Sequence, residues 1–575
     1  MADAPWIKTF PAGVSWDAEL PRISVLDMLD NAARHWPERP AIDFLGRKLS
    51  YRELRDLVDH AADGLQRLGV KPGVHVGLFL PNVPQYVIGF FAILRAGGTV
   101  VNYSPLDAGK VLAHKIEDSE TDILITLDLK TLYPTMASLL ATTRLRTLVV
   151  GSLGDFADQP EQTQAQLWQE NQVSAVAYGD RCLSFSQLLD NDGQYREHPP
   201  ADPEHSVAVL QYTGGTTGLP KGAMLTHANL SAAAGQVFLT NVDNDKLMHE
   251  GHESVLVVLP LFHVYAMVCD LLFPVLAAAE MRLRIKFDPT AILQDISQHK
   301  VSCFPGVPTM FTALVSHPQV GEYDLRSLKV CASGGAPLPV ELIHQFKRLT
   351  GCQLTEGWGM TETCTGGTFT PSGKHRPGSC GIPHIGTTIR FLDTEDPTRG
   401  VPLGERGEIA IAGPSVMRGY WRNEKASRDS FTEDGYFRTG DVGYMDDEGF
   451  IYIVDRTKDM LLCGGFNVYP RVIEEAIYTH PAVEEVLVLG IDDPYRGQSP
   501  KAYVKLRKGH APFSLDELKA FLRDRLGKHE MVQALEIRAD LPRTAVGKLS
   551  KQMLREEVES SHQGAQQEPE SPSVT

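Results

Sequence analysis

The chain has 575 residues, which is too long for a single hydrophobic core and predicts two or more domains, at least one of them large. Hydrophobic residues make up 42% and charged residues 22%, the balance of an ordinary globular protein. The formal net charge of -17 would repel phosphate backbones, so a nucleic-acid partner is excluded. Any anionic ligand then needs a locally positive or amide-rich pocket.

The first half of the chain alternates helix-like and strand-like segments. Residues 51–68 carry apolar side chains at helical spacing, with Ser50 as the predicted N-cap. Alternating segments follow in the order VHVGLFLP, YVIGFFAILRAG, TVVNYSP, AGKVLAHKIED and DILIT. This order predicts βαβ units and a mostly parallel sheet. We expect residues 155–175 to form an exposed connection and residues 190–205 a loop, because both segments are strongly polar.

The second half changes character twice. An αβ region starts at SVAVLQYT and ends near residue 390, and a stretch with β character follows, with TIRFLD, GEIAIAG and GYMDDEGFIYIVDR. Charge and glycine pairs near 455–470 indicate a hinge, and helix and strand patterns from 471 onward predict a small α+β domain. The predicted division is 1–455 for the large N-terminal domain, 456–558 for the C-terminal domain and 559–575 for a disordered tail, which lacks large apolar residues.

The cysteines and the apolar segments indicate the compartment. Eight cysteines are scattered without a CxxC pair or zinc-ligand spacing, which is typical of free thiols in a reducing compartment. The start, MADAPWIKTF, has no secretory pattern, so we expect a cytoplasmic protein. The most apolar stretch, 255–279, contains two prolines, a histidine and an aspartate, and is interpreted as buried strand and helix. Peripheral membrane contact and a homodimer both stay open.

The strongest local signal is the string YTGGTTGLPKGAMLTH at Tyr212–His227. A strand leads into a loop of glycines and threonines, whose amides and hydroxyls, with Lys221, suit the phosphates of a nucleotide. The spacing is not that of a Walker A loop, because Leu219 and Pro220 separate the last glycine from the lysine. A flexible surface loop is the alternative for a glycine-rich segment of this kind.

Five strings in order resemble the adenylate-forming superfamily, which includes acyl-CoA synthetases, luciferases and the adenylation domains of peptide synthetases. After the Tyr212 loop come GWGMTET, YFRTGD, DRTKD and PRTAVGK, and the likeness extends from about residue 20 to 555. The resemblance implies an α/β fold. It consists of a large N-terminal domain with two doubly wound αβ subdomains and a small β-barrel-like part, and a small mobile α+β C-terminal domain.

By this resemblance, the nucleotide site combines the phosphate loop with polar residues from later strings. The β- and γ-phosphates would lie against Thr213, Gly214, Gly215, Thr216, Thr217, Gly218 and Lys221. The adenosine and α-phosphate would be bound by Gly335, Ala336, Glu356, Gly357, Trp358, Thr361, Asp441 and Arg456. Among these, Trp358 would stack on adenine where the family more often has tyrosine, and Asp441 and Arg456 would bind the ribose.

The catalytic residues follow from the same resemblance. Glu362 is similar to the family's Mg²⁺ ligand, a hard oxygen donor of the kind that magnesium prefers. Lys548 would bridge the carboxylate and the α-phosphate during adenylation. Lys458 would be the hinge about which the C-terminal domain turns, and Gly464 and Gly465 would line the pantetheine tunnel of coenzyme A. Each of these residues alone would be interpreted as an ordinary surface residue or turn; only the ordered set indicates a site.

The predicted acyl pocket is apolar. The family comparison locates the acid near residues 260–265, 306–309 and 333–337, and His263 resembles a pocket histidine, although a buried structural histidine fits the pattern as well. No acidic residue stands out to hold an α-amino group. Arg282, Arg284 and Lys286 could bind the far carboxylate of a pimelate-like substrate, but their alternation is better explained by the wet face of a strand. Cys364 and Cys463 are interpreted as structural.

The sequence therefore predicts an ATP-, Mg²⁺- and coenzyme A-dependent ligase that activates a medium- or long-chain fatty acid and releases AMP and pyrophosphate. This is an enzyme of lipid metabolism. Dicarboxylic and aryl acids are alternative substrates. One alternative is a ligase that loads a carrier protein, which is less favoured because the sequence ends soon after Lys548. Another is a luciferase-like oxygenase, which is less favoured because the sequence has no peroxisomal SKL-type terminus. A non-catalytic binding protein is the alternative of another class; intact Glu362, Asp441, Arg456 and Lys548 argue against it.

Overall fold

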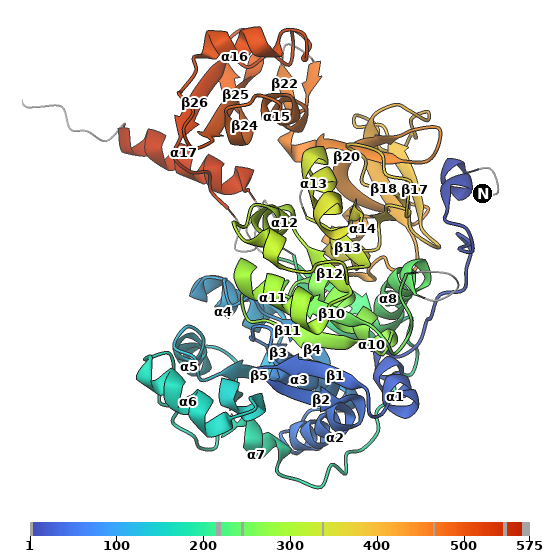
Figure 1. The fold of residues 1–575 in the computed structure, drawn as a ribbon, viewed down its shortest axis with the longest axis vertical. Coiled ribbons are helices and arrows are strands. Elements are labelled where there is room, and N and C mark those ends of the chain that lie inside the picture. Colours follow the sequence, from blue (N-terminus) through green and yellow to red (C-terminus); the bar gives the residue numbers. More distant parts are fainter. Residues whose placement is uncertain are drawn as a thin grey trace, which may run out of the picture. The chain divides into compact units, whose positions relative to one another are not determined.

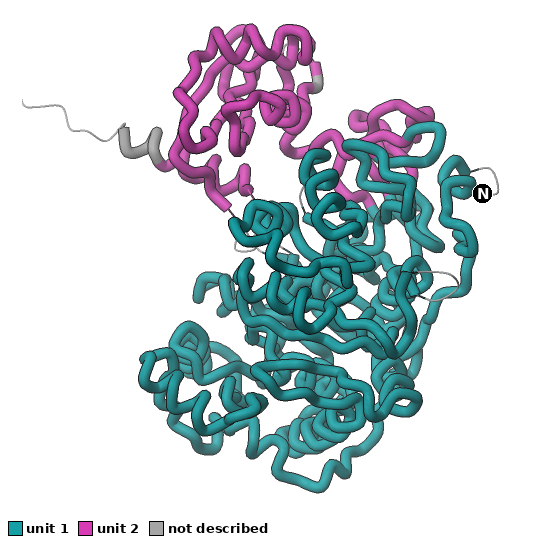
Figure 2. Tube along the Cα trace, in the orientation of Figure 1, with its two compact units in different colours: residues 1–389, 411–437, 446–451 teal, residues 390–410, 438–445, 452–575 magenta. Residues whose placement is uncertain are grey.

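The chain separates into two units in a computed structural model that describes residues 4–213, 220–242, 247–335, 338–463, 466–543 and 549–565. Figure 2 shows unit 1, which comprises residues 1–389, 411–437 and 446–451, and unit 2, which comprises residues 390–410, 438–445 and 452–575. Most of the apolar residues named as strand and helix in the sequence lie in the buried cores of these units. Each unit is described by itself below.

An eight-stranded, mostly parallel sheet forms one layer of unit 1 (Figure 1). Its strands, in spatial order, are β19 (Gly419–Tyr420), β9 (Gly222–Thr226), β8 (Val207–Tyr212), β4 (Thr99–Asn102), β3 (His75–Leu78), β5 (Thr121–Leu127), β6 (Thr147–Gly151) and β7 (Cys182–Ser184). The strands from β8 to β7 are parallel, whereas β9 is antiparallel to β8 and to β19. The predicted βαβ order is confirmed here.

Helices connect the strands of this sheet. They are α2 (Tyr51–Arg67), α3 (Pro84–Arg95), α4 (Gly109–Asp118), α5 (Tyr133–Thr142), α6 (Pro160–Gln169) and α7 (Phe185–Leu189). The sequence explains the start of α2, because the Ser50 side chain accepts from the Glu53 N–H while the Glu53 carboxylate accepts from the Ser50 N–H. Helix α3 is buried along its whole length, as expected for a helix that is apolar on every side.

A seven-stranded sheet forms a second layer of unit 1. In spatial order it contains β14 (Leu354–Glu356), β13 (Val330–Ser333), β12 (Cys303–Gly306), β10 (Ser254–Val257), β11 (Glu280–Leu283), β1 (Pro40–Phe44) and β2 (Arg47–Ser50). Only the β1–β2 hairpin at the edge is antiparallel. Figure 1 shows the N-terminal strands β1 and β2 beside β11, so the first αβ region contributes strands to the second sheet.

The connections of this second sheet include the apolar stretch 255–279, which forms buried strand and helix as predicted. The helical elements are α1 (Val25–His35), α8 (His227–Asn241), α9 (Val264–Ala266), the π-helical turn η3 (Met267–Leu272), α10 (Phe273–Leu276), α11 (Pro289–His299), α12 (Pro308–Val315), α13 (Val340–Thr350) and α14 (Glu424–Asp429). Short 3₁₀ turns are η1 (Pro5–Thr9), η2 (Leu153–Phe156), η4 (Val320–Glu322) and η5 (Thr361–Thr363). Strands β15 (Thr368–Phe369) and β16 (Ile382–Pro383) form a small antiparallel pair.

The predicted region of β character forms a four-stranded sheet. Its strands are β17 (Thr388–Leu392), β18 (Gly407–Ala412), β20 (Phe437–Met445) and β21 (Ile451–Arg456), in that spatial order. Turn η6 (Thr457–Asp459) follows β21 directly. This sheet lies in the sequence between the αβ regions and the C-terminal α+β part, where the small β-barrel-like part was expected.

The C-terminal part of unit 2 is an α+β structure, as predicted. Its five-stranded sheet has the order β23-β22-β25-β24, and β26 pairs with β25. The elements are β22 (Leu461–Cys463), β23 (Phe466–Val468), α15 (Pro470–Tyr478), β24 (Val483–Asp493), β25 (Gly497–Leu506), α16 (Leu515–Leu522), β26 (Ala534–Arg538) and α17 (Lys551–Ala565). The domain boundary at residues 455 and 456 stays a prediction.

Two segments differ from their predicted state. The expected connection at 155–175 contains helix α6, whose Leu167 is buried on an otherwise polar helix. Helix α17 extends to Ala565, into the segment predicted to be disordered from 559, because Leu554 and Val558 pack against β24 and β25 and support it. Residues 566–575 lie outside the described part of the chain.

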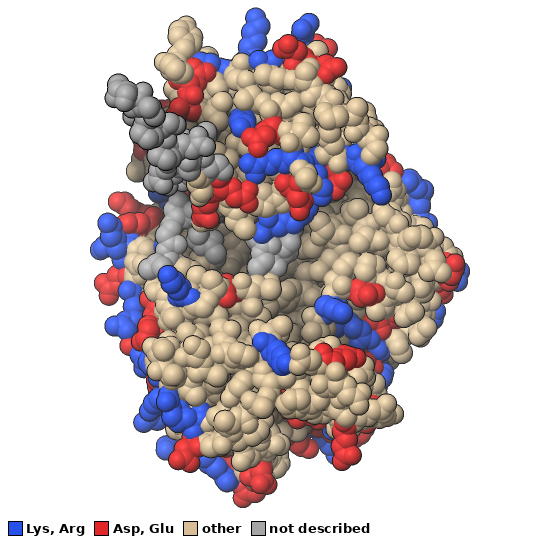
Figure 3. All heavy atoms as spheres, turned by 90° about the vertical axis from the view of Figure 1, so that its left-hand side faces the viewer, with Lys and Arg blue, Asp and Glu red and all other residues tan. Residues whose placement is uncertain are grey.

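Two further features concern the surface. Among the described residues, none of the helices combines the length and the apolar character needed to cross a lipid bilayer. On the face drawn in Figure 3, Lys and Arg side chains are interspersed with Asp and Glu side chains. The net charge of -17 is therefore not gathered into one acidic field on that face.

Candidate active site

The phosphate-loop string is flanked by two paired strands. β8 and β9 run antiparallel with Tyr212 opposite Gly222, and the Thr213 N–H donates to the Lys221 carbonyl at 2.9 Å. Thr213 and Lys221 therefore face each other across the base of the loop. The predicted phosphate-binding residues Gly214, Gly215, Thr216, Thr217 and Gly218 lie outside the described residues.

Tyr420 contacts both Lys221 and Glu362, the predicted magnesium ligand. The Lys221 ammonium lies 4.8 Å from the centre of the Tyr420 ring, and the Tyr420 hydroxyl donates to Glu362 Oε1 at 2.8 Å. β19 carries Tyr420 into position, because Gly419 and Tyr420 pair with Met224 and Ala223 of β9. Burial, and then the negative charge of Glu362, raise the pKa of the Tyr420 hydroxyl, so this hydroxyl stays a proton donor.

The geometry around Glu362 fits a magnesium ion shared with a nucleotide. The residue lies in turn η5, is half-buried, and its backbone carbonyl accepts from the Met417 N–H at 2.7 Å. Its carboxylate is a hard oxygen donor, and Mg²⁺ is usually held by one or two carboxylates together with substrate phosphates. Among the described residues, no cluster of three or more His, Cys, Asp or Glu is placed to hold a metal ion.

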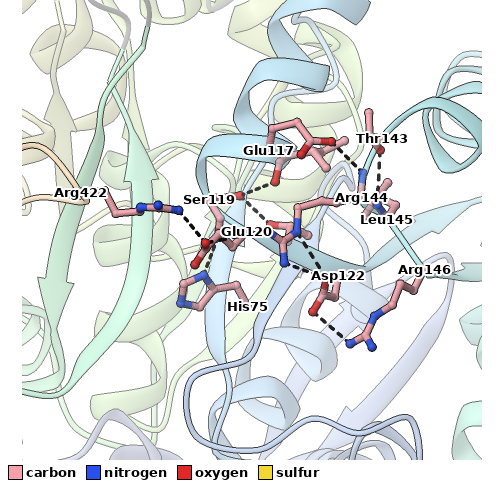
Figure 4. A network of polar contacts seen from close by, with 12 residues as sticks. His75, Glu117, Ser119, Glu120, Asp122, Thr143, Arg144, Leu145, Arg146 and Arg422 are labelled. Carbon is pink, nitrogen blue, oxygen red and sulfur yellow. Dashed lines mark hydrogen bonds and ion pairs between the residues drawn. The ribbon is translucent and has the colours of Figure 1, made fainter.

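The C-terminal end of helix α4 contacts the ends of β8 and β19. The Tyr212 hydroxyl donates to Asp118 Oδ2 at 2.5 Å, and the Trp421 indole N–H donates to the Asp118 carbonyl at 3.1 Å. Figure 4 shows that Arg422 points toward Glu120, with which it forms an ion pair at 2.5 Å. Tyr212 precedes the loop and Trp421 follows Tyr420, so one helix end positions both sides of the site.

The same network is anchored to the sheet. The His75 ring Nδ1–H donates to the Ser119 carbonyl, and the ring packs edge-on against Trp421 at 4.9 Å. In Figure 4, Arg144 and Arg146 both reach Asp122, at 3.1 and 3.0 Å. Burial lowers the pKa of His75, so the ring is neutral at neutral pH and contributes through packing and its hydrogen bond.

The predicted adenine-binding segments leave the ends of two neighbouring parallel strands. β13 and β14 pair with Ser333 opposite Glu356, so Gly335 and the segment Gly357–Trp358 leave the same edge of the sheet. Gly335 has φ +81, a conformation that favours glycine. The Trp358 N–H donates to the Thr368 hydroxyl at 3.0 Å, which fixes the backbone at the predicted stacking residue. Ala336 lies outside the described residues.

The other predicted residues of this edge have structural contacts. One Glu356 oxygen accepts from the Leu338 N–H at 3.3 Å, and its carbonyl accepts from the Thr370 hydroxyl at 2.6 Å. Thr361 begins turn η5 and is half-buried, directly before Glu362. The structure thus brings Thr361 and Glu362 together, while Glu356 supports the backbone at the end of β14.

The residues predicted for the acyl pocket pack around Tyr265. A Cβ at Gly334 would lie 3.0 Å from the Tyr265 ring, and the Tyr265 hydroxyl donates to the Ala332 carbonyl at 3.1 Å. A Cβ at Gly306 would lie 2.8 Å from the Phe311 ring. His263 caps helix α9, because its Nδ1 accepts from the Tyr265 N–H at 3.2 Å. His263 therefore supports the backbone at Tyr265, which agrees with the structural alternative, and its place beside a substrate stays a prediction.

Arg282 and Arg284 correct the interpretation of their strand as a wet face. Arg282 is 2% exposed and lies 2.9 Å from Asp43 Oδ1, while Arg284 pairs with Asp295 at 2.5 Å. β11 lies between β1 and β10, so both of its edges are covered. Burying an arginine requires charge partners, and these carboxylates supply them. Neither arginine is available for the far carboxylate of a dicarboxylic acid; Lys286 is exposed.

In unit 2, the predicted ribose-binding residues form an ion pair. Arg456 Nε lies 3.1 Å from Asp441 Oδ1, and the Asp441 side chain is 6% exposed. β20 carries Asp441, and Arg456 ends the adjacent strand β21. Two residues on, burial and the charge of Arg456 lower the pKa of Lys458 to about 8. Gly464, Gly465 and Lys548 lie outside the described residues.

The cysteines agree with the structural role predicted for them. All eight thiols are free, and Cys364 and Cys463 are fully buried. Burial raises the pKa of both thiols, which removes the thiolate that a nucleophile would need.

Sequence reasoning missed Tyr420, the residue that joins Lys221 to Glu362. It lies in the segment RGYWRN, between two strings that carried the resemblance. Its two-residue strand is too short to show periodicity, so only the pairing with β9 reveals its position.

Comparisons with known proteins agree with this geometry. Residues 29–421 match the family described as AMP-binding enzyme, and residues 472–548 match the AMP-binding enzyme C-terminal domain. The chain belongs to the AMP-binding enzyme family. The family resemblance and the α/β fold predicted from the sequence are both confirmed.

Relatives within this family cover nearly the whole chain. The chain is 39% identical over 565 residues to a long-chain-fatty-acid–CoA ligase of Bacillus subtilis, covering 97% of this chain and 99% of the relative. It is 33% identical over 560 residues to a long-chain-fatty-acid–CoA ligase of Escherichia coli, covering 96% and 98%. This AMP-binding enzyme is therefore an adenylate-forming acyl-CoA ligase, and its class as an AMP-forming ligase is established by the family.

Solved structures of family members show the same fold. ATP-bound MatB from Rhodopseudomonas palustris has a TM-score of 0.78 at 27% identity, covering 94% of this chain and 99% of that chain. O-succinylbenzoate coenzyme A synthetase of Bacillus subtilis, in complex with ATP and magnesium, has a TM-score of 0.74 at 26% identity, covering 92% and 99%. ATP and Mg²⁺ thus bind to structural relatives of this AMP-binding enzyme.

Proposed function

We propose that this chain converts a medium- or long-chain fatty acid, ATP and coenzyme A into acyl-CoA, AMP and pyrophosphate. The observation that carries the proposal is the line from Lys221 through Tyr420 to Glu362. There the exposed Lys221 ammonium lies over Tyr420, whose hydroxyl donates to Glu362, the residue that we propose as the magnesium ligand. The fatty-acid class is supported by the 39% identity to a long-chain-fatty-acid–CoA ligase.

The first half-reaction joins two anions. A carboxylate oxygen attacks the α-phosphorus of ATP, the bond between the α-phosphorus and the α,β-bridging oxygen breaks, and pyrophosphate leaves with that oxygen. The protein must offset charge repulsion and hold the nucleophile in line with the leaving group. We assign the phosphates to Thr213, the loop 214–218 and Lys221, and the α-phosphate to Thr361 and Lys548. When bound at Glu362, Mg²⁺ would neutralise phosphate charge.

The nucleoside part of ATP positions the reacting phosphorus. We assign the adenine to the edge formed by Gly335, Ala336, Glu356, Gly357 and Trp358, and the ribose hydroxyls to Asp441. Arg456 already holds the Asp441 carboxylate at 3.1 Å, so the carboxylate is oriented before the sugar binds. A site oriented in advance loses less free energy when the transition state forms.

The second half-reaction needs no protein nucleophile. The thiol of coenzyme A attacks the adenylate carbonyl, a thioester bond forms, and AMP leaves with the electrons of the broken mixed-anhydride bond. We assign the approach of the thiol to Gly464 and Gly465 and the change of arrangement to a hinge at Lys458. The buried, protonated state of Cys364 and Cys463 agrees with an attack by the coenzyme's thiol.

The substrate class rests on the apolar surroundings of Tyr265. Leu261, Phe262 and Val264 are buried near His263, which favours an alkyl chain over a polar acid. A pimelate-like substrate is disfavoured because Arg282 and Arg284 already have carboxylate partners. An aryl acid is kept as the second candidate, since the chain is also 34% identical over 526 residues to a feruloyl-CoA synthase of an Amycolatopsis species.

The test is to incubate the protein with ATP, Mg²⁺ and a panel of acids, and to quantify AMP with and without coenzyme A. The panel includes short, medium and long fatty acids, dicarboxylic acids and aryl acids. We expect coenzyme A-dependent AMP with medium or long fatty acids. AMP with aryl acids alone would reassign the substrate class, and saturable binding of ATP without AMP from any acid would contradict the proposed ligase.

A further inference from the structure

Unit 1 contains a cavity that the proposed reaction does not use. Its volume is about 430 Å³, and it lies where the parallel strands β6 and β7 end, with Val150 and Ser184 of its wall paired in register. Strands β5, β3 and β4 separate β6 from β8, which leads into the phosphate-loop string. Neighbouring strands lie about 4.8 Å apart, so the cavity is roughly 19 Å from β8 along the sheet. It is therefore separate from the phosphate-loop string.

The wall of this cavity combines a carboxylate with apolar surface. Asp155 lines it together with Ser152, Tyr178 and Phe185. Phe185 is buried, whereas Tyr178 is 51% exposed, so an aromatic ring is accessible to a ligand at the rim. None of the described residues that line the cavity is a lysine, an arginine or a histidine. The wall therefore offers a negative charge beside apolar side chains and supplies no positive charge.

A second carboxylate lies behind the wall. The Gln164 amide joins it to the lining, because its Nε2 donates to Asp128 Oδ2 at 2.9 Å and its Oε1 accepts from the Ser152 hydroxyl. Asp128 is 5% exposed, and its Oδ1 is buried without a hydrogen-bond partner among the described residues. Gln85 is fully buried and donates to Asp155 Oδ2 at 3.2 Å, while its own Oε1 also lacks a described partner. Two buried acceptors beside the cavity thus lack donors.

The charge of these carboxylates is not neutralised within the described part of the chain. Neither Asp128 nor Asp155 forms an ion pair with a described lysine, arginine or histidine. Desolvation raises the pKa of both carboxyl groups, and the negative charge of Asp155 raises the pKa of Asp128 further. A cationic ligand would offset this cost and supply donors, whereas an anion would increase it.

We propose that this cavity binds a small organic cation, with its ammonium group at Asp155 and its apolar part against Phe185 and the Tyr178 ring. An ammonium supplies both the N–H donors and the positive charge that the wall lacks. A cation that lies beside an aromatic ring is stabilised further by the electrons of the ring. Asp155 contacts the ligand, and Asp128 acts through its charge as a positioning residue. The inference does not depend on the acyl-CoA ligase reaction, because it involves neither ATP nor the acid.

Phenethylamine is the probe, because its ammonium and its ring match the two parts of the wall. Titration calorimetry of the full chain at neutral pH should show saturable binding with a Kd of about 1 mM or below, an affinity suited to so small a ligand. Phenethyl alcohol has the same shape without the charge. It should bind at least about tenfold more weakly, which corresponds to about 1.4 kcal/mol. Equal affinity for the amine and the alcohol would contradict a cation site.

A matched pair of variants tests the contact at Asp155. Asp155→Asn removes the charge and keeps the size of the side chain, so the Kd for phenethylamine should rise about tenfold. Asp180→Asn is the control, because Asp180 is an exposed aspartate close in sequence to Tyr178 that does not line the cavity, and it should keep the wild-type Kd. Asp128→Asn should weaken binding less than Asp155→Asn, since its charge acts from behind the wall.

The remaining outcomes locate the ligand. If Asp155→Asn does not fold, Ser186→Phe fills the cavity from an exposed position and should abolish binding. Glu362→Gln should keep the wild-type Kd; a weaker affinity would place the amine at the proposed magnesium site and overturn the inference. It is equally wrong if the wild type shows no saturable binding, or if Asp155→Asn binds phenethylamine as tightly as Asp180→Asn. A chain that binds the amine but forms no AMP would support the cavity and contradict only the proposed function.

Discussion

Two cations on neighbouring sheets of unit 1 have opposite surroundings. Arg282, in the seven-stranded sheet, is buried and contacts Asp43, Glu280 and Asp295 at 2.9, 3.7 and 3.9 Å. Lys221, beside the eight-stranded sheet, is exposed, lies over the neutral Tyr420 ring and makes no ion pair among the described residues. A charge that is already neutralised stabilises the fold, whereas a charge held by a neutral ring can meet an anionic ligand. The difference in partners therefore separates a structural cation from Lys221, which we propose as a functional cation.

The largest expected effect would come from the structural cation. Arg282→Met should reduce the free energy of unfolding by about 3 kcal/mol, because it removes the nearest charge partner of the buried Asp43 carboxylate. The measurement is denaturant unfolding of unit 1, followed by the KM for ATP of the protein that remains folded. We expect that KM to equal the wild-type value; a raised KM with unchanged stability would mean that Arg282 is part of the binding site after all.

Glu362, the proposed magnesium ligand, should give the next largest effect, now on rate. Glu362→Gln keeps the size of the side chain but removes its charge, so ATP–pyrophosphate exchange should fall about a hundredfold, the size expected for losing one electrostatic contact in the transition state. Raising Mg²⁺ should restore part of the rate. Glu341→Gln, an exposed glutamate of α13, is the control and should have no effect. Equal rates for Glu362→Gln and Glu341→Gln would remove Glu362 from the site.

The functional cation should have a smaller effect. Lys221→Met should raise the KM for ATP about tenfold, which corresponds to about 1.4 kcal/mol, without lowering the unfolding midpoint. Lys425→Met is the control, because Lys425 is also an exposed lysine and lies on the nearby helix α14. A loss of stability in Lys221→Met as large as that in Arg282→Met would abolish the distinction between the two cations.

The smallest effect concerns Lys458, a third cation, whose pKa is lowered by burial and by the charge of Arg456. Burial and Arg456 lower its pKa from 10.5 to about 8, so between these values the unfolded chain binds a proton that the folded chain has released. The free energy of unfolding should therefore rise with pH across this window, and the penalty is fully present below pH 8. Lys458→Met should lack this rise when the unfolding midpoint is measured against pH. A parallel pH profile for variant and wild type would show that Lys458 is not responsible.

Much of the fold could be predicted from local patterns. The N-cap at Ser50 and the largely apolar helix α3 were both evident, because caps and periodicity involve residues close in the chain. The pairing of β1 with β11 could not be predicted, since it joins segments far apart in sequence. Helix α6 was missed because its polar composition resembles a loop and only Leu167 is buried.

The candidate site shows the same limits of local reasoning. The strings around Lys221, Glu362 and Asp441 identified the family, but a string does not show which residues it meets. Tyr420 was missed because its role depends on pairing between β9 and β19. The error at Arg282 has the same origin, because alternation along β11 suggested a solvent face, whereas the Arg282 side chain is buried against Asp43, which lies far away in sequence, and near Asp295.

The central claim is that a carboxylate oxygen of the acid attacks the α-phosphorus of ATP beside Lys221 and Glu362. The direct measurement uses a fatty acid labelled with ¹⁸O in its carboxylate, followed by mass spectrometry of the released AMP after coenzyme A has been added. The account predicts that one labelled oxygen appears in AMP for each acyl-CoA formed. Unlabelled AMP, with acyl-CoA still produced, would contradict it.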